Sequence, residues 1–159
     1  PGLKTFLQDS RLCPLLLLGL LGMVISLHAP PANLTRAQWF EIQHINMAHS
    51  QCDPAMQVVN SYRGVCKDKN TFLHTTFAQV AHVCTTKNVA CRNRRMNCHK
   101  SPGRVPLTFC NLTKIESNYT KCKYSQMKMQ MIYIVACEQR SPQDNATYSL
   151  VPVHLDNII

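Results

Sequence analysis

Residues 66–72 read CKDKNTF, and the rest of the chain can be organised around this stretch. It places a cysteine, a lysine and an Asn-Thr pair on one short segment that runs into a predicted strand. Two distant histidines complete it, His44 in the segment QHIN and His154 in the segment VPVHLD. Alone, the stretch is only a basic loop; with two histidines it offers the side chains that acid–base chemistry uses near neutral pH.

The first 29 residues differ in composition from the rest. Lys4 and Arg11 precede an almost wholly apolar run at 12–27. This pattern predicts a secretory signal peptide over 1–29 and a mature domain over 30–159. The alternative, a transmembrane anchor, is disfavoured because the run is interrupted by proline and glycine and is shorter than the roughly 20 apolar residues of a spanning helix. We therefore expect a secreted, extracellular protein, released directly or after storage in secretory granules.

The chain is basic, with 17 Lys and Arg, 8 Asp and Glu, and a formal net charge of +9. Removing Lys4, Arg11 and Asp9 with the predicted signal leaves 15 basic and 7 acidic residues, a net charge of +8. Such a charge attracts polyanions, whether nucleic acid, anionic lipid or sulfated glycan, and does not choose among them. Four Asn-X-Thr sequons would accept glycans in an exported protein: Asn33, Asn111, Asn118 and Asn145.

Cysteine usage indicates a disulfide framework. Cys13 lies in the predicted signal, and eight cysteines remain: Cys52, Cys66, Cys84, Cys91, Cys98, Cys110, Cys122 and Cys137. An even number in a small exported domain favours disulfides, although spacing alone allows about 105 pairings. A zinc site is disfavoured because the chain has no C-x-x-C or H-x-x-H pair.

Hydrophobic and turn patterns divide the domain into helices followed by strands. A capping-box pattern opens a predicted helix at 35–47, Asp53 is predicted to cap a helix at 54–62, and a third helix is predicted at 77–84. Segments rich in β-branched and aromatic residues predict strands at 105–112, 121–125, 131–138 and 148–155. This order predicts an α+β fold with the helices packed on an antiparallel sheet.

The pattern CKxxNTF between QHIN and VPVHLD resembles the pancreatic-type (ribonuclease A) family of secreted ribonucleases, over residues from about 34 to 159. QWFEIQHI near the start and VPVHLD near the end resemble its eosinophil-type branch, including the monocyte-type relatives. The resemblance implies three helices on a curved, V-shaped antiparallel sheet. It also implies four disulfides: Cys52–Cys110, Cys66–Cys122, Cys84–Cys137 and Cys91–Cys98.

Two histidines and a lysine suit the cleavage of RNA. A neutral imidazole can take the proton of a ribose 2′-hydroxyl, a protonated imidazole can give one to the leaving 5′-oxygen, and a lysine can stabilise charge on the phosphate. By resemblance, His44 is the base, His154 the acid and Lys67 the stabilising cation. The implied product is a 2′,3′-cyclic phosphate, which water then opens. We expect neither a metal nor another cofactor.

The resemblance also implies contacts to the substrate. Thr71 matches a threonine that reads pyrimidines, and Asn97 and Glu138 match residues that meet the base across the scissile bond. Asp156 lies two residues beyond His154 on the same side of a strand, where it can bond to the imidazole. Three more residues on or near these motifs complete the predicted substrate-binding set: Gln43, Asn70 and Arg36. Of these, Arg36 is expected to contact a neighbouring phosphate.

Two positions depart from the family pattern. The residue after the second histidine, often phenylalanine in the family, is Leu155, which weakens packing on a pyrimidine. The end of the chain, residues 157–159, lacks a serine that some members carry, so a uracil preference is not implied.

Two other functions stay open. A cationic host-defence protein would bind anionic microbial surfaces, with RNA cleavage incidental. This hypothesis is motivated by the net charge and by three arginines in the predicted Cys91–Cys98 loop: Arg92, Arg94 and Arg95. These arginines form either a solvated basic face or a binding site for phosphate, glycan or membrane. A disulfide-stapled receptor ligand would leave the two histidines and the lysine unexplained.

The resemblance implies RNA as the substrate, a cytosolic ribonuclease inhibitor as a partner, and a monomer. The other histidines of the domain are interpreted as surface or core residues: His49, His74, His82 and His99.

Overall fold

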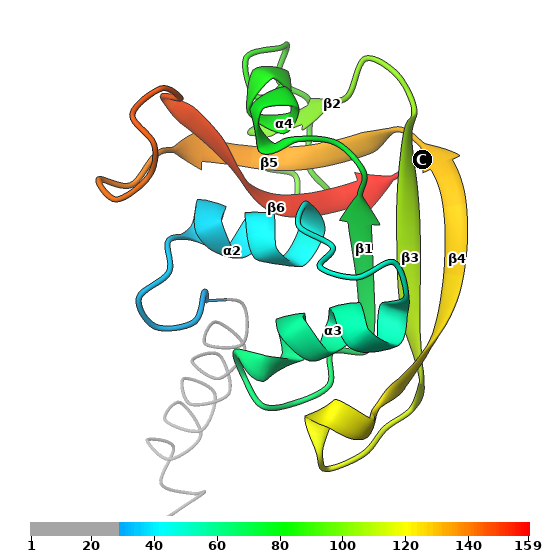
Figure 1. Cartoon of the computed structure of the whole chain (residues 1–159). Coiled ribbons are helices and arrows are strands. Elements are labelled where there is room, and N and C mark those ends of the chain that lie inside the picture. Colours follow the sequence, from blue (N-terminus) through cyan, green and yellow to red (C-terminus); the bar gives the residue numbers. More distant parts are fainter. Residues whose placement is uncertain (1–28) are drawn as a thin grey trace, which may run out of the picture. The chain divides into compact units, whose positions relative to one another are not determined.

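The α-helices of the described chain all lie in its first half, as the sequence predicts, but one strand, β1 (Lys69–Leu73), precedes the last of them (Figure 1). The structure is a computed structural model that describes residues 29–159, so the predicted signal peptide lies outside the described residues apart from Ala29. Among these residues, no helix has the length and apolarity that crossing a bilayer would require. Residues Pro31–Ile159 form one compact unit.

The first helix of the described chain begins with the predicted capping box. Helix α2 (Arg36–His44) begins after Thr35, whose hydroxyl accepts from the Gln38 N–H at 3.0 Å, while the Gln38 side chain accepts from the Thr35 N–H at 2.9 Å. The helix ends at His44 and does not extend to residue 47 as predicted. The reason is that the Asn46 N–H bonds to the carbonyl of Glu41, five residues back, which turns the chain out of the helix.

Helices α3 (Cys52–Ser61) and α4 (Phe77–Val83) also lie close to their predicted positions. The predicted cap of α3 is wrong: the helix begins at Cys52, and the Asp53 carboxylate instead accepts from the Tyr124 N–H at 2.7 Å, which ties α3 to a strand. Helix α4 is capped by Thr76, whose hydroxyl accepts from the Gln79 N–H.

The strands form two antiparallel sheets of three strands each, in the orders β1-β3-β4 and β2-β5-β6. The chain passes from one sheet to the other at Ile132, the single residue between β4 and β5. The α+β class is therefore confirmed. The strand bounds are β1 (Lys69–Leu73), β2 (Cys98–Lys100), β3 (Val105–Lys114), β4 (Lys123–Met131), β5 (Tyr133–Gln139) and β6 (Leu150–Ile158).

Two details of the strand prediction are wrong. The predicted strand at 121–125 begins later, because Tyr119–Lys121 forms a 3₁₀ turn capped by the Asn118 side chain. Strand β2 was not predicted, since three residues are too few to show an alternating pattern.

Two buried clusters meet at α2 and β1. Phe40 of α2 and Leu73 of β1 belong to one cluster, and their chain neighbours Trp39 and Phe72 belong to the other. Each element is thus packed from both sides, which fixes the polar residues that it carries at its ends. His44 ends α2, and the Asn-Thr pair lies in β1.

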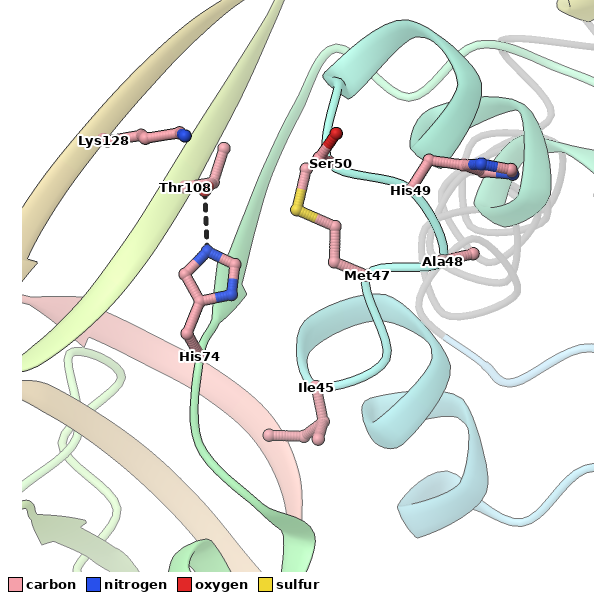
Figure 2. A pocket seen from close by; sticks show the side chains of 8 residues that line it. All are labelled: Ile45, Met47, Ala48, His49, Ser50, His74, Thr108 and Lys128. Atoms are coloured by element: carbon pink, nitrogen blue, oxygen red, sulfur yellow. Dashed lines mark hydrogen bonds between the residues drawn. The ribbon is translucent and has the colours of Figure 1, made fainter.

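All four implied disulfides are present: Cys52–Cys110, Cys66–Cys122, Cys84–Cys137 and Cys91–Cys98. Beside the connection between α2 and α3 there is a hollow of about 360 Å³ (Figure 2). It is lined by Ile45, Met47, Ala48, His49, Ser50, His74, Thr108 and Lys128.

Candidate active site

His44 is held in one orientation by the backbone of β1. Its side chain is buried, with 9% exposure, and its Nδ1 lies 2.8 Å from the carbonyl oxygen of Thr71. Because a carbonyl oxygen only accepts, Nδ1 carries the proton, and Nε2 of the neutral ring presents a lone pair. The ring can therefore act as a base through Nε2.

The surroundings of His44 keep it neutral. Burial, followed by the charges of Lys67 and His154, lowers the pKa of His44 to about 3, against a smaller opposing effect of the bond to Thr71. The imidazole is therefore unprotonated at neutral pH. The same effects show that Lys67 and His154 both lie within electrostatic reach of this ring.

Lys67 is held by side chains from α2 and β1. Its Nζ donates to Gln43 Oε1 at 2.9 Å and to Asn70 Oδ1 at 2.8 Å, and Asn70 Nδ2 donates to the Gln43 carbonyl at 2.8 Å. Burial, reinforced by Arg63, lowers the pKa of Lys67 to about 8, although Asp68 opposes the shift. The ammonium thus stays largely protonated at pH 7, with two of its three N–H bonds committed.

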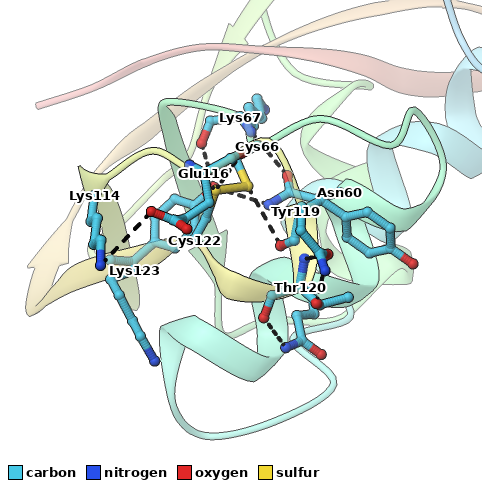
Figure 3. Close-up of a disulfide and its surroundings, with 12 residues drawn as sticks. Asn60, Cys66, Lys67, Lys114, Glu116, Tyr119, Thr120, Cys122 and Lys123 are labelled. Atoms are coloured by element: carbon cyan, nitrogen blue, oxygen red, sulfur yellow. Dashed lines mark hydrogen bonds and ion pairs between the residues drawn. A yellow bond between two sulfur atoms is a disulfide. The ribbon is translucent and has the colours of Figure 1, made fainter.

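The backbone of Lys67 is fixed beside the Cys66–Cys122 disulfide (Figure 3). Its N–H donates to Asn60 Oδ1 at 3.0 Å, and its carbonyl accepts from the Tyr124 hydroxyl at 2.5 Å. Asn60 Nδ2 in turn donates to the Tyr124 hydroxyl oxygen at 3.0 Å. Asn60 and Tyr124 position Lys67 from outside the motif, and no sequence pattern indicated these two partners.

His154 contrasts with His44. It lies on β6 opposite Ala136 of β5, and its side chain is 54% exposed. Its Nε2 is 3.5 Å from Asp156 Oδ1, a charge contact longer than a hydrogen bond. The Asp156 side chain is only 7% exposed, and its Oδ2 accepts from the Arg92 N–H at 3.0 Å. The carboxylate is therefore anchored, while the imidazole is largely exposed to solvent.

The fold brings these groups together from remote parts of the chain. Helix α2 packs on both β6 and β1, so the helix that ends at His44 lies between the strand of His154 and the segment of Lys67. The result is two imidazoles and one ammonium around one site.

The family model for pancreatic ribonuclease matches residues 35–156. The chain belongs to the pancreatic ribonuclease family. This membership supports ribonuclease activity with RNA as the substrate, and the α+β fold with four disulfides agrees with it.

The outer residues predicted for the candidate site meet beside Cys137 and Glu138 of β5. Asn97 Nδ2 donates to the Cys137 carbonyl at 3.2 Å, which places it beside Glu138. Glu138 is paired with Arg36 at 2.5 Å and more distantly with Arg95 at 3.9 Å. Arg36 and Glu138, two residues predicted to touch different parts of the RNA, thus pair with each other.

Three possible metal ligands lie close together near the candidate site, among the residues from 29 onward: Cys91, Cys98 and Asp156. The two sulfurs are bonded to each other, so neither is a thiolate that could bind a metal. The histidines that were interpreted as surface or core residues include examples of both kinds. His99 is buried and bonds to the Thr86 carbonyl, whereas His82 is exposed.

Proposed function

We propose that this protein is a metal-independent endoribonuclease that cleaves single-stranded RNA on the 3′ side of pyrimidines. The observation that carries the proposal is the pairing of a neutral, backbone-oriented imidazole, His44, with a lysine ammonium and a second imidazole at one site. A general base, a fixed cation and a general acid are the three groups that cleavage by the 2′-hydroxyl needs.

In the first step, His44 Nε2 takes the proton of the ribose 2′-hydroxyl, and the 2′-oxygen forms a bond to phosphorus. The bond from phosphorus to the 5′-oxygen breaks, and protonated His154 gives its proton to that oxygen. Lys67 stabilises the negative charge that builds on the non-bridging oxygens. The products are a 2′,3′-cyclic phosphate and a free 5′-hydroxyl, and DNA cannot react because it lacks the nucleophile.

In the second step, the histidines exchange roles. His154, now neutral, takes a proton from water, whose oxygen attacks the cyclic phosphate. His44, now protonated, returns a proton to the 2′-oxygen as its bond to phosphorus breaks. A 3′-phosphate monoester is formed and both histidines regain their starting states.

The low pKa of His44 suits a base that becomes stronger when substrate binds. In the free protein the ring is neutral and ready to accept a proton. A phosphate beside it adds negative charge that offsets Lys67 and His154, so substrate raises the pKa of His44 toward its ordinary value. The base is thus available at neutral pH and gains proton affinity where it is needed.

The substrate contacts follow from groups beside this centre. Gln43 accepts from Lys67 through Oε1, which leaves its amide N–H groups to donate to a phosphate oxygen. Asn70 fixes Lys67, and the Thr71 hydroxyl can donate to or accept from a pyrimidine, so it can pair with uracil or cytosine. Asn97 and Glu138 would meet the next base, and Arg36 a neighbouring phosphate.

A second candidate function is membership of the eosinophil-type branch with a role in host defence, following export and glycosylation. The observation that favours it is a run of exposed basic side chains on and after the 91–98 loop: Arg92, Arg94, Arg95, Lys100 and Arg104. Binding to an anionic surface depends on these charges and not on the histidines. A His44→Ala protein that keeps full bactericidal potency would separate the two functions.

The test of the first proposal is a digestion of poly-U, poly-C and poly-A by purified, oxidised protein between pH 5 and 8 with a metal chelator present. We expect cyclic-phosphate ends from the two pyrimidine polymers, slow cleavage of poly-A, and cleavage by His154→Ala that is at least about 100-fold slower. Intact pyrimidine polymers at every pH would refute the proposal.

A further inference from the structure

The hollow beside the connection between α2 and α3 has a basic and hydroxylic lining (Figure 2). Its lining includes His49, His74 and Lys128 and contains no aspartate or glutamate. Its volume of about 360 Å³ lies in the range of small-molecule sites. An anion is the ligand that such a lining favours.

The wall formed by residues 45–50 is fixed at both ends. At the start, the Asn46 N–H bonds to the Glu41 carbonyl at 2.9 Å. At the end, the Gln126 side chain on β4 accepts from the Cys52 N–H at 2.7 Å and donates to the Ser50 carbonyl at 3.4 Å, and a disulfide ties Cys52 to β3. A ligand would therefore meet a preformed wall, which reduces the ordering cost of binding.

The opposite wall presents two basic side chains, of which His74 is held by a hydrogen bond. His74 Nε2 lies 2.7 Å from the hydroxyl of Thr108, a buried residue, and Figure 2 shows the other ring nitrogen turned toward the 45–50 segment. Lys128 is the direct partner of Thr108 in the register of β3 and β4, so their side chains share a face. Unlike Lys114 and Lys123, Lys128 makes no ion pair within the described part of the chain.

This hollow is distinct from the site of His44 and Lys67. The His74 N–H bonds to the Pro106 carbonyl at 2.9 Å and continues the ladder one residue beyond β1. The lining of the hollow comes from the 45–50 segment, His74, Thr108 and Lys128, and includes none of His44, Lys67 and His154.

We propose that the hollow binds the phosphate monoester of a nucleotide, with the Lys128 ammonium and the His74 Nδ1–H donating to the phosphate. Ile45 and Met47 supply an apolar side against which the base packs. The choice of a nucleotide rests on the proposed function, whose second step produces 3′-phosphate monoesters. The anion site itself does not depend on catalysis.

The test is residue-resolved NMR titration of the folded, oxidised protein with three probes: inorganic phosphate, uridine 3′-monophosphate and uridine. We expect the monophosphate to shift the signals of residues 45–50, His74 and Lys128 in a binding event separate from that at His44. Phosphate alone should bind more weakly at the same residues, and uridine should not bind there. Lys128→Gln should weaken binding at the hollow about tenfold, because a charge-assisted contact is lost.

Lys123→Gln is the matched control, since Lys123 lies on the same strand and the substitution changes the net charge equally. It should leave affinity at the hollow unchanged. Shifts confined to His44, Lys67 and His154, or an equal loss in the two lysine variants, would overturn the site. Equal affinity for inorganic phosphate and the monophosphate would overturn the nucleotide assignment. Because the readout is binding at named residues, an inactive protein that binds here would refute only the proposed function.

Discussion

The two histidines of the candidate site are held in opposite ways. His44 is buried, bonded to a backbone carbonyl and flanked by a lysine whose own side chain makes two hydrogen bonds. His154 is 54% exposed and has a 3.5 Å contact to its carboxylate. We call the residues around His44 and Lys67 the buried wall, and His154 with Asp156 the open wall.

The difference matches the different tasks proposed for the two walls. The buried wall must hold a neutral base and a cation at fixed distances from one phosphate, so rigidity and exclusion of water serve it. The open wall must protonate a leaving group that departs with the rest of the RNA, so access of the ring to solvent serves it. The comparison predicts that substitutions in the buried wall act on every substrate, whereas the loss at His154 depends on the leaving group.

The largest effect is expected for the histidines themselves. His44→Ala and His154→Ala should each lower kcat/KM on RNA by about 100- to 10,000-fold, because each removes a proton-transfer group. A uridine 3′-aryl phosphate has a leaving group that needs no protonation. With this substrate His154→Ala should recover most of the activity, and His44→Ala should not.

The control for both variants is a native circular dichroism spectrum with all four disulfides formed. Equal rescue of the two variants by the aryl substrate would contradict the assignment of base to the buried wall and acid to the open wall.

The next largest effect is expected at Lys67. Lys67→Gln should lower kcat by about 100- to 1,000-fold, since one preorganised charge is removed from the transition state. Lys67→Arg should fall between this variant and the wild type, because the guanidinium keeps the charge but does not reproduce the two bonds to Gln43 and Asn70. Steady-state kinetics on a dinucleotide measures this, and a rise in KM with unchanged kcat would show that Lys67 only binds substrate.

The pH dependence of the unfolding free energy should reflect the burial of His44. Between pH 6.5 and about 3 the unfolded chain binds a proton at this residue and the folded chain does not, because the folded-state pKa is lowered to about 3. Stability is therefore fully present above pH 6.5 and is lost as pH falls, by up to about 1.4 kcal/mol per pH unit. Urea unfolding of His44→Gln should show a shallower loss than the wild type.

His82→Gln is the matched control for this measurement, since His82 is exposed. Its unfolding free energy should follow the wild-type pH dependence. If His44→Gln kept the wild-type dependence of unfolding free energy on pH, His44 would not be the residue that loses its proton on folding.

The smallest effect is expected at Asp156. Asp156→Asn should lower kcat/KM by less than about tenfold, because a contact of 3.5 Å to a half-exposed ring is a weak ion pair. The amide oxygen can still accept from the Arg92 N–H, so the loop of residues 91–98 should stay in place. A loss as large as that of His154→Ala would show that the open wall is more rigid than its contacts indicate.

The sequence predicted what local patterns and a strong motif can specify. The predicted capping box at Thr35 is present and α2 begins directly after it. The disulfide pairs implied by the family resemblance are all present as well. The three α-helices and five of the six strands of the described residues were also predicted, and the missed strand, β2, is too short to show a pattern.

Other features depend on contacts between segments far apart in the chain. Asp53 caps no helix because its carboxylate accepts a hydrogen bond from the N–H of Tyr124, which is 71 residues away. Arg36 and Glu138 pair across 102 positions, and Asn60 fixes the backbone of Lys67 from a neighbouring helix. No local pattern encodes such partners, so the outer contacts of the site could not be derived from the sequence.

The central claim is that both walls face a single phosphorus atom. An NMR titration of the His44 and His154 ring protons, with and without uridine 3′-monophosphate, tests it most directly. We expect the bound phosphate to raise the pKa of both histidines together, with His44 starting well below its ordinary value. A nucleotide that raises the pKa of only one histidine, or of neither, would contradict the account.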